Sequence, residues 1–232
     1  MKKFLTMAMI FLFLFPAIET VFAKGAGIEW DILNKEVVEL YRTGQYDRAV
    51  AVAKKALEVA EKNVGPDHPD VATSLNNLAL LYKDQGQYAQ AEPLFKRALS
   101  IWEKALGPEH PLVATSLNNL ATLYDDQGQY AQAEPLFKKA LAIYEKALGP
   151  DHPDVATSLN NLAELYRNQG QYVQAEPLYK RALSILEKAL GPDHPSVATS
   201  LNNLAVLYRE MKRDEEAKPL ERRAARIRAK GK

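Results

Sequence analysis

Gly65-Pro66-Asp67-His68-Pro69 decides the fold of this chain, because the same five-residue phrase, with Asp or Glu at its third position, returns every 42 residues. It begins again at Gly107, Gly149 and Gly191. The blocks between the phrases are close to copies, since block 65–106 differs from the next two blocks at only seven and six positions. Self-similarity at such a period is typical of a solenoid, whose units bury their apolar faces only by stacking on neighbours.

Each block contains two stretches with the periodicity of a helix. In the first stretch of block 65–106, apolar residues recur at spacings of three and four, at Val71, Leu75, Leu78, Ala79 and Tyr82. Gln85-Gly86-Gln87 interrupts the pattern, and a second apolar face follows over 88–102. The Gly-Pro of the phrase ends a helix, and its last Pro suits the first turn of the next one. Each block therefore predicts an antiparallel helical hairpin.

The two ends of the chain diverge from the copies. Residues 24–64 predict a divergent first hairpin, and the copied units follow as 65–106, 107–148, 149–190 and 191–211. In residues 212–232, charged residues replace the apolar ones: Asp214, Glu221 and Arg228 stand in the registers of Tyr88, Phe95 and Trp102. A terminal helix has no neighbour to cover large apolar residues. We therefore interpret 212–232 as a C-terminal capping helix.

The first 23 residues have the composition of an export signal. Lys2 and Lys3 precede an apolar run of twelve residues, and Val21-Phe22-Ala23 has the small-residue pattern of a cleavage site. The run is short for a membrane-spanning helix, and Glu19 would still lie in the hydrocarbon. The absence of Cys fits an exported protein. We expect a cleavable signal peptide, 1–23, rather than a retained anchor, and a periplasmic or secreted protein.

Composition and motifs exclude several classes of function. Cleavage of the signal peptide would remove Lys2, Lys3 and Glu19 and would reduce 30 basic and 29 acidic residues to 28 of each. A chain with no net charge and no basic stripe does not predict nucleic-acid binding. No Gly-rich phosphate loop and no nucleophile with a convergent base is present. The four histidines lie one per hairpin and cannot converge on one metal ion: His68, His110, His152 and His194. We expect no enzyme activity, no cofactor, no metal and no membrane contact beyond the signal.

The residue order of the copies resembles the tetratricopeptide repeat family. Leu75-Asn76-Asn77-Leu78-Ala79-Leu80-Leu81-Tyr82 is followed by Gly86-Gln87-Tyr88, Ala91, Phe95 and Ala98-Leu99. The 42-residue spacing, the paired Asn and the Gly-Pro-Asp-His-Pro linker resemble the kinesin light chain type of this repeat. The resemblance covers 65–211 strongly and both flanks loosely. It implies an all-α, right-handed superhelical solenoid of stacked antiparallel hairpins, whose first helices line a concave groove for extended peptides.

Helical periodicity independently predicts which residues line such a groove. If the apolar face of each first helix meets the core, a rotation of about 100° per residue places another set of positions on the opposite side. Most first-helix differences between the copies fall on this set, as expected of a surface adapted to a partner. We call it the first-helix stripe: Asp31, Lys35, Val38 and Arg42; Thr73, Asn77, Leu80 and Asp84; Thr115, Asn119, Thr122 and Asp126; Thr157, Asn161, Glu164 and Asn168; and Thr199, Asn203, Val206 and Glu210.

The second Asn of each pair is the sharpest candidate in the stripe, because Asn is a poor residue for a helix interior. One hypothesis is a ladder of amides, at Asn77, Asn119, Asn161 and Asn203, that bonds to the backbone of an extended peptide. The resemblance also implies a peptide contact there. The alternative is that the amides join neighbouring hairpins, and we favour this for the first Asn of each pair.

Two other features of the copies have competing interpretations. Lys35 and Arg42 make one end of the stripe basic, whereas Asp84, Asp126, Glu164 and Glu210 make the rest acidic. This could orient a bound peptide, or it could be an ordinary solvated face. Trp102, Tyr144 and Leu186 share one register, and we expect them to contact the next hairpin rather than a ligand.

These features together predict a non-enzymatic scaffold that binds an extended peptide segment of a partner protein in the groove. The alternative is a structural or self-assembling envelope protein whose repeat array mediates homo-oligomerisation. The basic residues of the last helix, Arg222, Arg223, Arg226, Arg228, Lys230 and Lys232, could serve that second role.

Overall fold

The computed structural model describes residues 27–230, and that part of the chain is helical, with no strand. The prediction of an all-α array of hairpins is therefore confirmed, whereas the predicted signal peptide, 1–23, lies outside the described residues. A helix over 27–42 is followed by α2 (Tyr46–Val64), α3 (Pro69–Asp84), α4 (Tyr88–Leu106), α5 (Pro111–Asp126), α6 (Tyr130–Leu148), α7 (Pro153–Asn168), α8 (Tyr172–Leu190), α9 (Pro195–Glu210) and α10 (Asp214–Lys230).

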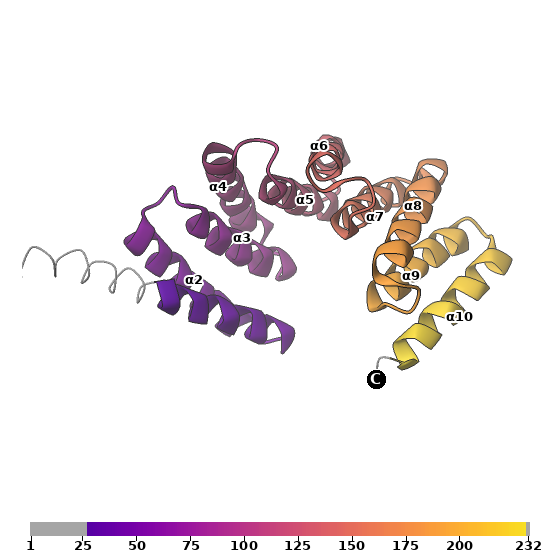
Figure 1. The fold of residues 1–232 in the computed structure, drawn as a ribbon, viewed down its shortest axis with the longest axis horizontal. Coiled ribbons are helices and arrows are strands. Elements are labelled where there is room, and N and C mark those ends of the chain that lie inside the picture. Colours follow the sequence, from indigo (N-terminus) through magenta and orange to yellow (C-terminus); the bar gives the residue numbers. More distant parts are fainter. Residues whose placement is uncertain (1–26, 231–232) are drawn as a thin grey trace, which may run out of the picture. The chain divides into compact units, whose positions relative to one another are not determined.

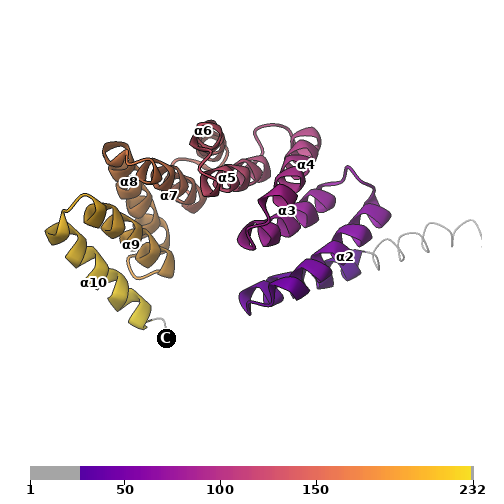
Figure 2. The ribbon, with the colours of Figure 1, turned by 180° about the vertical axis from the view of Figure 1, so that it is seen from behind.

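The chain divides into two compact units, Met1–Ile101 and Trp102–Lys232, and the boundary falls inside α4. In the first unit, α3 packs on α2 (Figure 1). In the second unit, α5 pairs with α6, α7 with α8, and α9 with α10, and contacts of α6 with α7 and of α8 with α9 join consecutive hairpins (Figure 2).

The core follows the predicted periodicity. Val71, Leu75 and Ala79 are completely buried, and Leu78 packs with Leu81 against the first hairpin. The second helices α4, α6 and α8 each contribute a large ring to the core in the same register, and these rings are at most 1% exposed: Phe95, Phe137 and Tyr179. The stacking of apolar faces on neighbouring helices thus stabilises each unit.

The histidine of the repeated phrase has a structural role that the sequence did not reveal. His152 precedes α7, and its Nδ1 accepts a hydrogen bond from the backbone N–H of Asp154 at 3.2 Å. The same N-cap bond, also at 3.2 Å, forms at His68, His110 and His194. An N-cap acceptor satisfies one of the backbone donors left free in the first helical turn. The phrase therefore ends one helix with its Gly and begins the next with its His.

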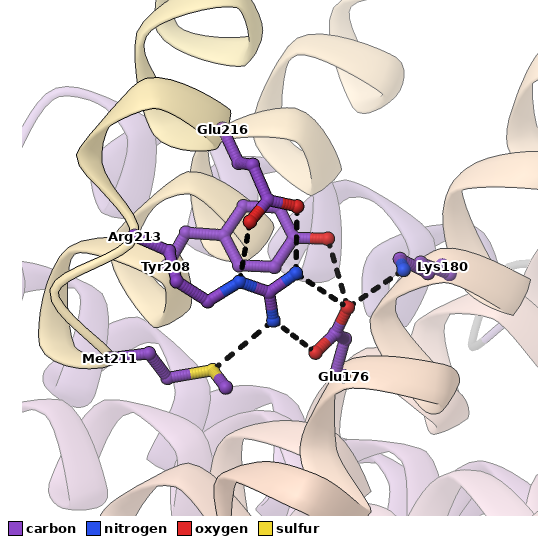
Figure 3. Close-up of polar contacts among 6 residues, drawn as sticks. All are labelled: Glu176, Lys180, Tyr208, Met211, Arg213 and Glu216. Carbon is purple, nitrogen blue, oxygen red and sulfur yellow. Dashed lines mark hydrogen bonds and ion pairs between the residues drawn. The ribbon is translucent and has the colours of Figure 1, made fainter.

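A polar cluster fastens the last hairpin to the one before it (Figure 3). Arg213 Nη1 donates to Glu176 Oε2 of α8 at 2.6 Å, and its Nε donates to Glu216 Oε1 of α10 at the same distance. The guanidinium also lies 4.3 Å from the centre of the Tyr208 ring, and the Tyr208 hydroxyl donates to Glu176 at 3.1 Å. Lys180 Nζ completes the cluster at 2.7 Å from Glu176. One arginine therefore joins α8, α9 and α10.

Two charged residues of α10, Glu221 and Arg228, also form polar contacts with α9. Glu221, in the register of Phe95, accepts two hydrogen bonds from Arg209 at 2.9 and 2.7 Å. Arg228, in the register of Trp102, donates to the side-chain oxygen of Asn202 when that amide is oriented to receive it. In the last described helix, charged side chains thus form polar contacts in the registers that hold apolar residues in earlier helices.

The cluster around Glu176 predicts a defined loss of stability in acid. The pKa of Glu176 falls from 4.5 to about 2, chiefly because Arg213 donates to its carboxylate. A pKa lowered by folding stabilises the folded state fully above pH 4.5, and this contribution disappears as the pH falls towards 2. We therefore expect Arg213→Gln to lower the free energy of unfolding most above pH 4.5, and its difference from the unchanged chain to shrink as the pH falls towards 2.

The measurement is urea denaturation across this pH range, together with NMR titration of the Glu176 carboxyl carbon. Lys218→Gln is the control, because Lys218 pairs with the exposed Glu215, which lies outside the cluster. An unaltered Glu176 titration in Arg213→Gln would contradict the prediction.

Candidate functional site

The stripe residues of the first unit surround two pockets. The larger pocket has a volume of about 490 Å³, and the smaller has a volume of about 270 Å³. Val38, Arg42 and Asn77 line both pockets, so the two adjoin. The larger pocket also receives Asp31, Lys35 and Thr73, and the smaller receives Leu80 together with Val37, Tyr41 and Leu81. The structure thus brings all the predicted stripe residues of this unit except Asp84 to these two pockets.

The second unit has a pocket of about 430 Å³ between α7, α8 and α9. Four stripe residues line it: Thr157, Asn161, Thr199 and Asn203. Pro153, Asp154, Asn160, Leu186, Leu190 and Ser196 complete its wall, and none of these was among the predicted site residues. Of them, Asp154, Leu186 and Ser196 lie in registers that differ between the copies, and these differences could have indicated them.

The other stripe residues lie outside these three pockets: Asp84, Thr115, Asn119, Thr122, Asp126, Glu164, Asn168, Val206 and Glu210. Some of them form contacts within the repeats. Asp84 accepts a hydrogen bond from the Tyr41 hydroxyl at 2.6 Å, and the Asn168 amide donates to Asp125 at 3.1 Å. The stripe residues at the C-terminal ends of α3 and α7 therefore form hydrogen bonds with neighbouring helices of their own unit.

Four of the five stripe threonines, those in the first turn of their helices, form the same hydrogen bond. Each hydroxyl donates to the proline carbonyl four residues earlier in its helix, over 3.2–3.4 Å: Thr73, Thr115, Thr157 and Thr199. A hydroxyl has one hydrogen and two acceptor lone pairs. These threonines can therefore accept a further hydrogen bond, but they have no second hydrogen to donate.

The first Asn of the pair joins neighbouring hairpins, as we favoured. The Ser158 hydroxyl of α7 donates to Asn118 of α5 at 3.3 Å, and the Ser200 hydroxyl of α9 donates to Asn160 of α7 at 3.4 Å. Both serines are completely buried. This repeated Ser–Asn bond could not be recognised in the sequence, because its partners are 40 residues apart.

The second Asn of the pair does not make the same contacts in every repeat. In the first unit, Asn77 Nδ2 donates to Asn34 Oδ1 at 3.2 Å, so this amide takes part in a bond between hairpins. In the second unit, the amides of Asn161 and Asn203 have no hydrogen-bond partner among residues 27–230, and both line the pocket of 430 Å³. The amides at these two positions are therefore free to bond to a ligand.

The acidic part of the stripe is less negative than the sequence suggested. Arg167 lies in the register beside the stripe, and its guanidinium is 3.2 Å from Glu164 and 3.8 Å from Glu210. Asp84 has Lys83 at 3.2 Å. The predicted contrast between a basic and an acidic end counted the stripe alone, whereas these basic neighbours compensate part of its negative charge.

The described part of the chain offers no metal centre and no membrane span. Within residues 27–230, no group of three or more His, Asp or Glu side chains is arranged to hold a metal ion. None of the helices in that range is long and apolar enough to cross a bilayer.

Comparison with known proteins identifies the repeat. The sequence model of the family described as Tetratricopeptide repeat matches residues 38–99, 77–146, 126–188 and 154–230. A Podospora anserina protein, described as a kinesin light chain with nearly identical TPR-like repeats, is 29% identical, with a TM-score of 0.68 over 87% of this chain and 96% of that one.

Two further matches cover only part of the other protein. A Rap protein complexed with the Competence and Sporulation Factor is 18% identical, with a TM-score of 0.76 over 87% of this chain and 54% of that one, and it shows the fold alone. The Secreted RxLR effector protein RXLR-C07 of Plasmopara halstedii is 36% identical over 66 residues, which are 28% of this chain and 20% of that protein. The match thus spans a fifth of that relative. Because the family matches run from residue 38 to residue 230, the chain belongs to the tetratricopeptide repeat family, with repeats of the kinesin light chain type.

Proposed function

We propose that this protein is a non-enzymatic scaffold that binds an extended segment of a partner protein along the first-helix stripe. The tetratricopeptide fold supports a role in protein–protein interaction. The similar fold of the Rap protein, which was solved as a complex with the Competence and Sporulation Factor, supports the use of such an array for holding a ligand.

The free amides of Asn161 and Asn203 carry the proposal. They come from successive first helices, α7 and α9, and face one pocket together with the acceptor hydroxyls of Thr157 and Thr199. An extended peptide presents unpaired N–H and C=O groups along its length, and an amide side chain can bond to both kinds. The pocket volume of about 430 Å³ also lies in the range of about 300–1,000 Å³ that is usual for ligand sites.

The test is capture of partners by cross-linking in the envelope fraction, with the unchanged chain beside a variant carrying Asn161→Ala and Asn203→Ala. Loss of two hydrogen bonds from a desolvated site, at about 1–1.5 kcal/mol each, predicts at least a tenfold loss of captured partner. Helicity and thermal stability should stay unchanged, because neither amide bonds to another described residue.

Gln90→Ala with Gln174→Ala is the matched control, since these exposed amides lie on second helices, away from the stripe. Partners that persist in the Asn161/Asn203 variant, or cross-links between copies only, would contradict groove binding. Self-cross-links with a concentration-dependent mass in light scattering would instead favour the self-assembling envelope protein.

We also infer that the chain is exported. The apolar run and cleavage pattern of residues 1–23 support this inference. Mass spectrometry of the protein recovered from the cell envelope or the medium should find an N-terminus at Lys24. An intact N-terminus at Met1 would favour a retained anchor instead.

A further inference from the structure

We propose that the pocket between α7, α8 and α9 receives a phenol, the side chain of a tyrosine in the bound partner segment. This proposal rests on the proposed function, because it names one side chain of the segment that the stripe would hold. The evidence is a comparison of two successive hairpins, α5–α6 and α7–α8, of which the first has Tyr144 where the second has Leu186.

In the hairpin α5–α6, a tyrosine of the chain itself fills the corresponding space. Tyr144 of α6 is 6% exposed, and its hydroxyl lies 2.8 Å from Thr115 Oγ1. Burial raises the pKa of Tyr144, and its hydroxyl also has side-chain hydrogen bonds with Thr115 and Asn118 and lies near the carboxylate of Asp154. The phenol is thus held by a threonine and an asparagine of its own hairpin, beside the first turn of the next hairpin.

The direction of the bond between Tyr144 and Thr115 follows from a count of hydrogens. The Thr115 hydroxyl already donates its single hydrogen to the Pro111 carbonyl at 3.2 Å. We infer from this that Tyr144 is the donor and Thr115 the acceptor. Thr115 and Asn118 thus recognise a phenol through hydrogen bonds to its hydroxyl, which a phenylalanine ring does not have.

In the hairpin α7–α8 the residues equivalent to Thr115 and Asn118 are present, but the ring is absent. One period of 42 residues relates Thr115 to Thr157, Asn118 to Asn160, and Asp154 to Ser196, and all three later residues line the pocket of 430 Å³. The residue that corresponds to Tyr144 is Leu186, whose side chain is shorter and has no hydroxyl.

The threonine and the asparagine are more exposed in the hairpin without the ring, as expected if the ring covers them in the hairpin before it. Thr115 is half-buried whereas Thr157 is exposed, and Asn118 is 6% exposed whereas Asn160 is only half-buried. Thr157 donates to the Pro153 carbonyl at 3.3 Å, as Thr115 does to Pro111, so its hydroxyl oxygen can accept a hydrogen bond from a phenol. Asn160 still accepts from Ser200 at 3.4 Å, which leaves its NH₂ group able to donate to a phenol oxygen.

The surroundings suit a tyrosine that belongs to a polypeptide. Leu186 and Leu190 give the ring an apolar wall, whereas the free amides of Asn161 and Asn203 lie at the same pocket and can bond to the backbone beside the ring. Aromatic residues combine a large apolar area with a polar tip, which matches this mixed lining.

The test uses a small probe and the full chain, so that it does not depend on the partner. N-acetyl-tyrosinamide is titrated into the isotopically labelled protein, and the amide and methyl NMR signals of Thr157, Leu186, Thr199 and Asn203 are followed. We expect saturable shifts at these residues, and binding of N-acetyl-phenylalaninamide about fivefold weaker, since it lacks one hydrogen bond.

Reciprocal exchange of the two residues provides the matched variants. Leu186→Tyr restores the ring that Tyr144 supplies one repeat earlier, and it should abolish the shifts while the helical content stays unchanged. Tyr144→Leu should open a second site, with new shifts at Thr115 and Asn118. Thr157→Val keeps the shape of the pocket but removes the acceptor, so it should equalise the affinities for the tyrosine and phenylalanine probes.

The proposal is overturned if no saturable shift appears at the pocket, if Leu186→Tyr binds the probe as well as the unchanged chain does, or if both probes bind equally before Thr157 is changed. Groove binding could fail separately, since it is measured by partner capture in the Asn161/Asn203 variant. Probe binding without partner capture would leave the phenol subsite in place and contradict the scaffold function alone.

Discussion

Replacing Phe137 by Ala is expected to lower the free energy of unfolding of the second unit by about 3–5 kcal/mol, the usual cost of truncating a buried phenylalanine. Phe137 is 1% exposed on α6, and α6 packs both on α5 in its own hairpin and on α7 of the next. The cavity left by its ring would therefore weaken contacts within a hairpin and between hairpins. In a repeat protein, both contributions to stability are lost together.

Urea denaturation followed by far-UV circular dichroism measures this loss. A second transition or a lower m-value in Phe137→Ala would show that the hairpins on the two sides of α6 had become uncoupled. Glu221→Ala is the matched control, because Glu221 stands in the register of Phe137, but its side chain is 42% exposed and paired with Arg209. We expect little change there. A loss below about 1 kcal/mol for Phe137→Ala would contradict the packing argument.

Replacing Gly149 by Ala is expected to destabilise the chain by about 2 kcal/mol through the backbone alone. Gly149 ends α6 with φ 89° and ψ 156°, a region that only glycine occupies readily. Its N–H donates to the Glu145 carbonyl, so the conformation is part of the helix end. A Cβ at this position would meet no atom within 4 Å, and steric clashes with other residues therefore do not contribute.

Gly170 provides the control for this prediction. Its φ of 72° is in the left-handed region, which Asn adopts more easily than other residues, and a Cβ there also meets nothing within 4 Å. The last hairpin places Lys212 in the same register at φ 59°, so the chain itself accepts a side chain in this turn. We expect Gly170→Asn to cost clearly less than Gly149→Ala in the same denaturation experiment. Equal losses would contradict the distinction between the two turns.

The periodic parts of this protein were predictable because each depends on neighbours within one helix or one turn. The apolar face of α3 and the Gly and Pro at the helix ends were read correctly from residues such as Leu75, Gly149 and Pro153. The His N-cap was missed although it is local, because His is not one of the usual N-cap residues.

The candidate site could be predicted only in part, because its members depend on contacts between helices that are about 40 residues apart. Asn77 and Asn161 are equivalent in sequence, yet Asn77 bonds to Asn34 while Asn161 is free. Glu164 was counted as a free charge, whereas it lies beside Arg167. Identical repeats therefore give identical helices, but each repeat has its own neighbours.

The amino-acid sequence by itself determined the period, the hairpins, the family and the helix face on which the stripe lies, because these follow from propensity and from the spacing of apolar residues along one chain segment. The tertiary structure alone decided which side chains on that face remain available. Packing of α7, α8 and α9 leaves a space beside Leu186 that Tyr144 fills in the repeat before it. A difference of one ring becomes a pocket only when the surrounding helices are already held in place by their own cores.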